Sequence, residues 1–181
     1  AAASTSQLLN FSTPQPYIMD IRPATPADLD AVWYLWKAVV DQKIYFPYDE
    51  TYSRAQMEAT WINLDNAVFV ADLDGQIVGA YILRPNQPGY GKHIANAAYM
   101  VDAQIRGQKI GTQLCAHSIQ AAKNLGYRGM QFNLVVSTNE SAVRAWKANG
   151  FEIIGTTPGG FYHHELGYVD TYIFFKDLTK G

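Results

Sequence analysis

The chain has 181 residues, of which 48% are apolar and 13% aromatic, and its formal net charge is −2. This length favours one domain with a sizeable core, and this composition excludes a disordered chain. The slightly acidic balance argues against nucleic acid as a partner. No apolar run approaches the ~20 residues that span a bilayer, so we expect no membrane partner.

The single cysteine and the opening segment indicate where the protein resides. Cys115 excludes an internal disulfide and lies in an apolar helical stripe, so we predict a buried, unreactive thiol and a reducing, cytoplasmic location. Residues 1–16 lack the basic-then-apolar pattern of a secretion signal. We therefore predict a tail over residues 1–16 and one folded domain over residues 17–181.

Hydrophobic periodicity and turn residues predict the elements in chain order. In the N-terminal half these are a strand over 17–22, a helix from the Thr25-Pro26 start, a helix over 53–64, a hairpin of 67–73 and 76–83, and a strand over 93–102. In the C-terminal half they are a helix ending at Gly126, a strand over 130–136, a helix over 140–148, and strands over 151–156 and 169–175.

The segment PGGFYHHELG, residues 158–167, is rich in polar and flexible residues and predicts a loop between the last two strands. The full order β-α-α-β-β-β-α-β-α-β-β contains one strand–helix–strand crossover. This order indicates an α/β (α+β) domain with a mixed central sheet flanked by helices.

The turn RGQKIGT, residues 106–112, is the most informative segment for function. Its glycines allow a ligand to approach the backbone closely, and the helix that follows begins with unpaired N–H groups at its positive end. We predict a cradle for phosphate or pyrophosphate, with an ordinary strand–helix connection as the alternative. A P-loop is excluded because Lys109 precedes Gly111, and the glycine spacing of a dinucleotide fingerprint is also absent.

This turn resembles the Arg/Gln-x-x-Gly-x-Gly/Ala pyrophosphate loop of the Gcn5-related N-acetyltransferase (GNAT) family, with Lys109 in place of the usual middle glycine. The segment NESAVRAWKANGF, residues 139–151, resembles the family's Asn-x-x-Ala-x-x-x-Tyr-x-x-x-Gly-Phe. Trp146 replaces the tyrosine that commonly protonates the departing thiolate. The order of elements also looks like the GNAT fold, in which two strands splay apart.

The resemblance implies acetyl-CoA as the cofactor and assigns its contacts. Backbone groups near Met100 and Val101 are expected to polarise the thioester carbonyl, Asn139 to lie close to the cofactor, and Trp146 either to contact it or to be core. The expected pyrophosphate contacts are Arg106, Gly107, Gln108, Lys109, Ile110, Gly111 and Thr112.

Asn96 and Asn133 interrupt two apolar strands, where asparagine is disfavoured. As buried amides they would need partners, and hydrogen bonds to backbone at a bulge are one interpretation. NAAYMVDAQIRGQKIG, FNLVVSTNESAVRAW and VDTYIFFKDL, however, resemble the fungal L-azetidine-2-carboxylate acetyltransferase group, which acetylates small cyclic secondary amino acids. That resemblance implies that Asn96 and Asn133 are catalytic. Because an amide is no base, we expect Asn96 to orient the amine and Asn133 to bind the acceptor's carboxylate.

The predicted function is an acetyl-CoA-dependent N-acetyltransferase for a small-molecule amine, by direct transfer in a ternary complex. Two alternatives stay open: a polyamine or peptide N-acetyltransferase, and a non-catalytic acyl-CoA sensor, motivated by Lys109 and the missing tyrosine. No metal is expected, because His163-His164 lacks further ligands at metal spacing and fits a solvated lid or acceptor rim. A homodimer through the C-terminal strands also stays open.

Overall fold

The computed structural model describes residues 19–63, 65–105 and 108–180, and the expected tail lies outside them. The elements follow the predicted order, with two 3-10 turns at Pro26–Asp28 and Gly89–Gly91. Their bounds are β1 (Met19–Pro23), α1 (Leu29–Val40), α2 (Arg54–Trp61), β2 (Ala67–Leu73), β3 (Gln76–Pro85), β4 (Ile94–Val101), α3 (Ile110–Asn124), β5 (Gly129–Val136), α4 (Glu140–Ala148), β6 (Glu152–His163) and β7 (Gly167–Asp177). The predicted fold class is confirmed.

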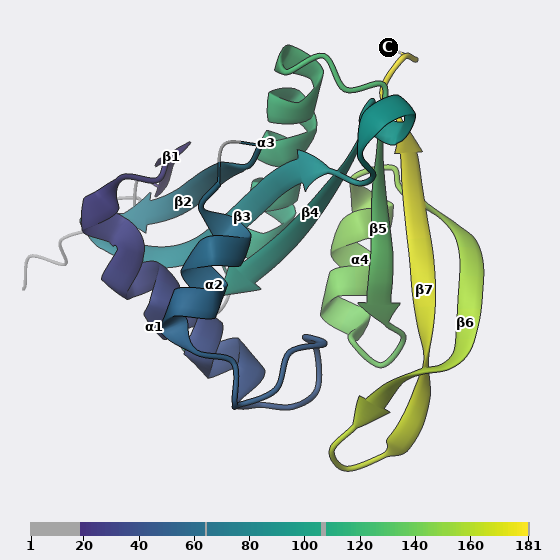
Figure 1. Cartoon of the computed structure of the whole chain (residues 1–181), viewed down its shortest axis with the longest axis horizontal. Coiled ribbons are helices and arrows are strands. Elements are labelled where there is room, and N and C mark those ends of the chain that lie inside the picture. The colour runs from purple at the N-terminus through teal and green to yellow at the C-terminus, as the bar shows by residue number, and fades with distance from the viewer. Residues whose placement is uncertain (1–18, 64, 106–107, 181) are drawn as a thin grey trace, which may run out of the picture.

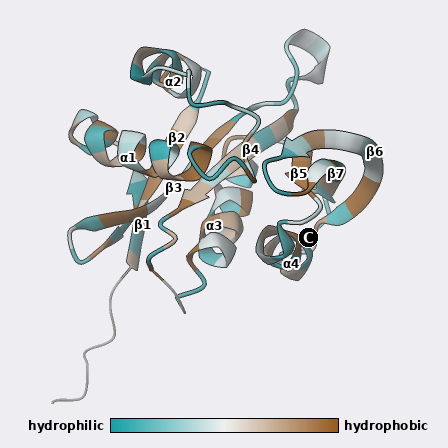
Figure 2. Ribbon diagram, turned by 90° about the horizontal axis from the view of Figure 1, so that it is seen from below, coloured by the Kyte–Doolittle hydropathy of each residue, from teal (hydrophilic) through white to brown (hydrophobic). Residues whose placement is uncertain are grey.

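The seven strands form one mixed sheet in the order β1-β2-β3-β4-β5-β7-β6, with helices on both faces. Seen along the sheet, α1 and α2 cover one face and α3 and α4 the other, and the strands between them are largely apolar (Figure 2). We call these the α1/α2 face and the α3/α4 face. Each face has its own core, because side chains alternate along a strand: Ala98 and Met100 of β4 pack with α1 and α2, whereas Ala95 and Ala97 pack with α3.

The sheet is split between its two central strands. β4 and β5 are parallel neighbours, but they pair only at Ile94 with Gly129 and at Ala95 with Met130. Beyond these two pairs β4 runs on to Val101 beside β3, and β5 runs on beside β7, so the strands diverge (Figure 1). The expected splay of these two strands is therefore present.

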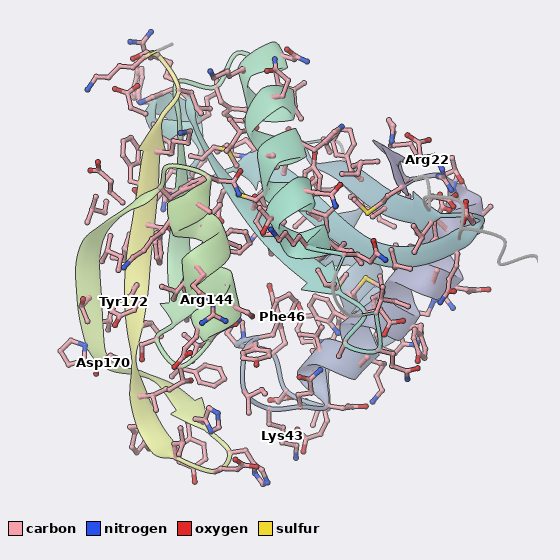
Figure 3. All side chains as sticks on the ribbon, turned by 180° about the vertical axis from the view of Figure 1, so that it is seen from behind. Arg22, Lys43, Phe46, Arg144, Asp170 and Tyr172 are labelled. Carbon is pink, nitrogen blue, oxygen red and sulfur yellow. The ribbon has the colours of Figure 1, made fainter. Side chains whose placement is uncertain are left out.

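The connection from β1 to α1 is held by one ion-pair network at the far end of the molecule from the β6–β7 hairpin (Figure 3). Arg22 binds the buried carboxylate of Asp28 through both terminal nitrogens, at 2.9 and 3.0 Å, and also binds Asp72 at 3.1 Å. The backbone N–H and hydroxyl of Thr25 donate to the same Asp28 carboxylate. The guanidinium of Arg22 holds the pKa of Asp28 well below its usual range.

The predicted loop over 158–167 is wrong in most of its length, because β6 continues to His163 and pairs with β7 up to Gly167. The pattern Pro158-Gly159-Gly160 forms a bulge, not a turn, and the register shifts between Thr157 and Phe161. β6 is the edge strand of the sheet, where a proline and a bulge are tolerated. The turn is confined to residues 164–166.

Two other expectations concern single residues on α3. Cys115 is fully buried, as predicted, and burial raises the pKa of its thiol to about 12. The apolar spacing of the sequence places Leu125 on the same stripe as Cys115, but Leu125 is 59% exposed, because the helix has already ended at Asn124 and the chain turns at Gly126. Within the described ranges, no helix is long and apolar enough to cross a membrane.

Candidate active site

The split in the sheet exposes one backbone edge of β4. The N–H of Asp102 donates to Val78 and the carbonyl of Ile94 accepts from Asn86, so even-numbered residues of β4 direct their backbone groups to β3. Backbone groups alternate along a strand, and the odd-numbered residues therefore point to β5. Beyond the two β4–β5 pairs, toward the C-terminal end of β4, the N–H groups of Ala97, Tyr99 and Val101 face the gap.

This alternation corrects one part of the expectation for the thioester. Val101 presents its amide to the gap, as expected, whereas the amide of Met100 faces β3. The Met100 side chain is also buried in the core of the α1/α2 face. Of Met100 and Val101, only Val101 can donate its backbone N–H to a group that lies between β4 and β5.

The start of α3 lies at the edge of this gap, where a Cβ on Gly111 would be 3.8 Å from Val101 Cγ2. Gln113 donates to the carbonyl of Lys109, but the N–H groups of Ile110, Gly111 and Thr112 donate to no acceptor in the described residues. The first turn contains no acidic residue. Arg106 and Gly107, which were expected to contribute, lie outside the described residues. The helix start therefore offers the unpaired donors and positive dipole end that a pyrophosphate requires.

Gly111 and Lys109 shape this helix start in different ways. Among the described residues, a Cβ on Gly111 would meet only Val101 Cγ2, at 3.8 Å, so these residues leave the space in front of this glycine open. Lys109 is the residue before the helix, with φ 50° and ψ 35°, which is the left-handed region that glycine prefers. The exposed lysine thus adopts the backbone conformation of the glycine that it replaces. These residues, with Gln108 beside them, fit a pyrophosphate group.

The segment that resembles the second family motif forms α4 and the turn before it. Asn139 caps this helix, and its Oδ1 accepts from the N–H of Ala142 at 3.2 Å. Trp146 is 7% exposed and packs on Tyr99 and Phe132, with ring centroids 4.7 and 5.2 Å apart. These contacts support the interpretation of Trp146 as core. Asn149, which the sequence did not single out, joins α4 to the first turn of α3 by donating to the carbonyl of Thr112.

Asn96 and Asn133 both lie on the α1/α2 face of the sheet, on opposite sides of the gap. Asn96 points to the same face as Ala98 and Met100, which lie two and four residues further along β4. Asn133 follows Phe132, which packs on the other face, and its Oδ1 accepts from Gln131, two residues before it. Asn133 Nδ2 donates to Asn86 Oδ1 at 2.7 Å, and Gln131 Nε2 donates to Asn133 Oδ1 at 3.0 Å. The Asn96 amide has no partner in the described residues.

The expectation that both amides are buried is wrong. Asn133 is exposed and Asn96 is only half-buried. The reason is the split itself: where β4 and β5 diverge, the strands no longer cover each other's side chains. Asn133 does lie at a bulge, because the β5–β7 register shifts between Phe132 and Val135, but its amide bonds to the side chains of Asn86 and Gln131 and not to backbone. Both amides are accessible from the α1/α2 face.

Three segments surround this polar patch. The connection between α1 and α2 includes Lys43 and Phe46, and the Phe46 side chain packs on the core of the α1/α2 face. The β6–β7 turn touches that connection, because His164 N–H donates to the carbonyl of Lys43 at 3.3 Å. The loop after β3 lies over the start of the gap and contributes Asn86.

The α1–α2 connection is rich in aromatic residues, which could either wall an acceptor pocket or pack on the core. Tyr45, Phe46, Tyr48 and Tyr52 are half-buried and pack against the core of the α1/α2 face. Trp36 of α1 is fully buried, and the rings of Phe46, Tyr48 and Tyr52 lie 4.6 to 5.8 Å from it. These distances support the packing interpretation.

Asp102, the carboxylate that follows β4, and His163 of the last turn both accept hydrogen bonds from nearby backbone N–H groups. Asp102 Oδ1 accepts from the N–H of Gln104 in the turn after β4. His163 was expected in a solvated lid, but it is 7% exposed, and its Nδ1 accepts from the N–H groups of Glu165 and Leu166. Within residues 19–63, 65–105 and 108–180, no group of three metal-ligating side chains is present.

A divided sheet, a helix start whose N–H groups fit an anion beside the gap, and polar side chains on the α1/α2 face are typical of the acyl-CoA-dependent transferase class. The chain belongs to the acetyltransferase (GNAT) family, whose model matches residues 33–151. Acetyl-CoA is the cofactor of this family.

Relatives and solved structures agree with this assignment. A Gcn5-related N-acetyltransferase from Kribbella flavida is 34% identical, covers 88% of this chain and 97% of its own, and superposes with a TM-score of 0.84. A phosphinothricin acetyltransferase from Sinorhizobium meliloti, solved with acetyl-CoA, is 20% identical over 88% of both chains with a TM-score of 0.79, which shows the shared fold.

N-acetyltransferase aca1 of Schizosaccharomyces pombe is 34% identical over 112 residues, which are 61% of this chain and 53% of that protein. Protein SPT10 of Saccharomyces cerevisiae is 31% identical over 58% of this chain and 16% of its own length. The chain therefore spans only part of the curated relatives that it matches.

Proposed function

We propose that the protein is an acetyl-CoA-dependent N-acetyltransferase that acts on a small amine, with a proline-like cyclic amino acid as the expected acceptor. The observation that supports this proposal most directly is the gap between β4 and β5. The start of α3, with its unpaired N–H groups, lies beside this gap, and the Asn96 and Asn133 amides lie on its α1/α2 face. This arrangement supports direct transfer, because the cofactor and the acceptor can approach the same gap from different sides.

The unpaired backbone N–H groups at the start of α3 indicate which residues would hold acetyl-CoA. The amides of Gln108 to Thr112 would bind the pyrophosphate with help from Lys109, and Arg106 and Gly107 remain predicted contacts. Asn139 would also lie close to the cofactor, whereas Trp146 would contribute only through its packing on Tyr99 and Phe132. Acetyl-CoA supplies an activated acetyl group as a thioester, whose C–S bond breaks as the C–N bond to the acceptor forms. Val101 N–H would donate to the acyl oxygen.

The acceptor must present a neutral nitrogen, and the chain's role is to orient it. Asn96 can hold the amine, or a water that takes its proton, without itself becoming protonated. Asn133 is held in place by Asn86 and Gln131, so its amide is pre-oriented at the opposite strand. The amine's proton passes to solvent, and the thiolate leaves without a dedicated acid.

An acyl-CoA sensor without catalysis is the second candidate, because Lys109 and Trp146 both depart from the family pattern. It predicts cofactor binding without turnover of any amine. A polyamine or peptide acceptor, a homodimer through β6 and β7, and a cytoplasmic location also remain proposals.

The test is release of CoA thiol from acetyl-CoA with azetidine-2-carboxylate, proline analogues and polyamines. We expect turnover that favours the cyclic amino acid and falls on the order of 10²-fold in Asn133→Ala. Asn124→Ala is the matched control, because Asn124 ends α3 and bonds only to Gln120 in the described residues. Measurable acetyl-CoA binding with no thiol release in the presence of any amine would refute the enzymatic function and support the sensor.

A further inference from the structure

Arg84 lies beside the two asparagines and has no role in the site described so far. It is opposite Asn96 in the β3–β4 register. Directly opposed residues of antiparallel strands point to the same face, with Cβ atoms about 5 Å apart. The guanidinium therefore belongs to the α1/α2 face, where Asn96 and Asn133 are accessible.

The charge of Arg84 is not neutralised within the described residues. Arg22, Arg54 and Arg144 all form ion pairs, whereas in the part of the chain that the structure describes Arg84 has neither a carboxylate nor a hydrogen-bond acceptor within bonding distance. It is nevertheless half-buried. A partly desolvated guanidinium without a partner is costly, so a bound anion would stabilise it.

Arg84 also lines a cavity of about 400 Å³ at the end of β3. The other charged groups of its lining are Lys92 and Asp65, so two cations face one carboxylate. The lining includes Asn86, whose side chain holds Asn133 at 2.7 Å. The cavity is thus linked directly to the polar patch beside the gap, and its charge balance favours an anionic group.

We infer that Arg84 binds the carboxylate of the acceptor, the group first expected to bind Asn133, and so restricts the enzyme to amines that carry an acid group close to the reacting nitrogen. This inference rests on the proposed function and identifies its substrate class. Arg84 can bind a carboxylate through two parallel N–H groups, which a lysine or an amide cannot reproduce. Asn96, on the neighbouring strand, remains available for the nitrogen. A polyamine has no group for Arg84 and is repelled by it.

The experiment compares two pairs of acceptors, azetidine-2-carboxylate with its carboxamide and proline with prolinamide, using the full chain. Thiol release gives kcat and KM, and calorimetry gives the affinity of each acceptor for the CoA-loaded protein. For wild type we expect tighter binding and lower KM with the carboxylates. In Arg84→Gln this preference falls by roughly 10- to 100-fold through KM, while the carboxamides are unaffected.

Arg84→Lys should retain part of the preference, and Arg144→Gln, an exposed arginine on α4, should retain all of it. Acetyl-CoA affinity equal to wild type shows that a variant is folded. Equal wild-type binding of carboxylate and carboxamide, or an equal loss of both in Arg84→Gln, would overturn the role of Arg84 and leave the acetyltransferase intact. Absence of thiol release with every amine would instead overturn the proposed function, and the calorimetric comparison would still decide whether Arg84 binds carboxylates.

Discussion

Lys109 joins an unfavourable backbone conformation to a positive charge, and two substitutions separate these effects. At φ 50° and ψ 35°, a residue with a side chain is disfavoured by about 1–2 kcal/mol, whereas glycine is not. Glycine in turn loses about 0.4–1 kcal/mol through the greater freedom of the unfolded chain. Lys109→Gly should therefore stabilise the protein by about 0.5–1 kcal/mol, which is about 1–4 °C in Tm for a chain of this length. Lys109→Ala keeps the strain and should leave Tm nearly unchanged.

Both variants remove the ammonium group beside the free amides of α3. Because Lys109 is exposed, its contact with a pyrophosphate is screened and contributes about 0.5–1 kcal/mol. Acetyl-CoA Kd should rise about 2- to 5-fold in both variants, and the rise should shrink with added salt. Scanning calorimetry and titration calorimetry measure the two quantities. A Tm of Lys109→Gly no higher than that of Lys109→Ala would refute the backbone argument, and an unchanged Kd in both would refute the phosphate contact.

Three further predictions concern the sheet, the core and the ion-pair network. Gly129→Ala should lower the free energy of unfolding by about 1–3 kcal/mol in denaturant titrations, because its Cβ would lie 2.9 Å from the Phe175 ring at a β4–β5 pair; an unchanged midpoint would contradict this. Cys115 should resist thiol reagents at pH 8 until the protein unfolds, because burial raises its thiol pKa to about 12, and rapid labelling of folded protein would show the packing to be wrong. Arg22 lowers the pKa of Asp28, so this pair stabilises the fold above the unfolded pKa of about 3.9 and its contribution is lost as the pH falls below that value. Asp28→Asn should therefore lower Tm at pH 7 and flatten its acid dependence below pH 4, and parallel Tm–pH curves for both proteins would contradict this.

Most of the fold could be predicted because its signals are local. Alternating apolar residues, the Asp74-Gly75 turn and the Thr25-Pro26 helix start act within a few residues, and the predicted order of elements is confirmed. The bulge at Pro158-Gly159-Gly160 was missed because its residues are those of a turn. Whether they form a turn or a bulge depends on pairing with β7, which begins at Gly167.

The site could be predicted only in part, since its contacts join distant segments. Asn96 and Asn133 are visible in the sequence as polar residues within apolar strands, and the helix start at Lys109 follows from its motif. Asn86 could not be found in this way, because it meets Asn133 across 47 positions and through a loop. Arg84 carries a weaker signal: aligning the predicted strands places it opposite Asn96, but only once the register is known.

The way in which the two halves of the sheet are joined has a mechanical consequence. Two residue pairs provide the backbone link between β4 and β5, whereas Ala95 and Ala97 share one apolar cluster with Met130, Phe132 and Val135 on the α3/α4 face. Hydrogen bonds fix distance and angle, but apolar contact is non-directional and tolerates small rotations. The spacing of β4 and β5 beyond Ile94 and Gly129 therefore depends on side-chain packing on the α3/α4 face, so changes in the size of Ala97, Phe132 or Val135 should alter the width of the opening more than changes on the strands' outer ends.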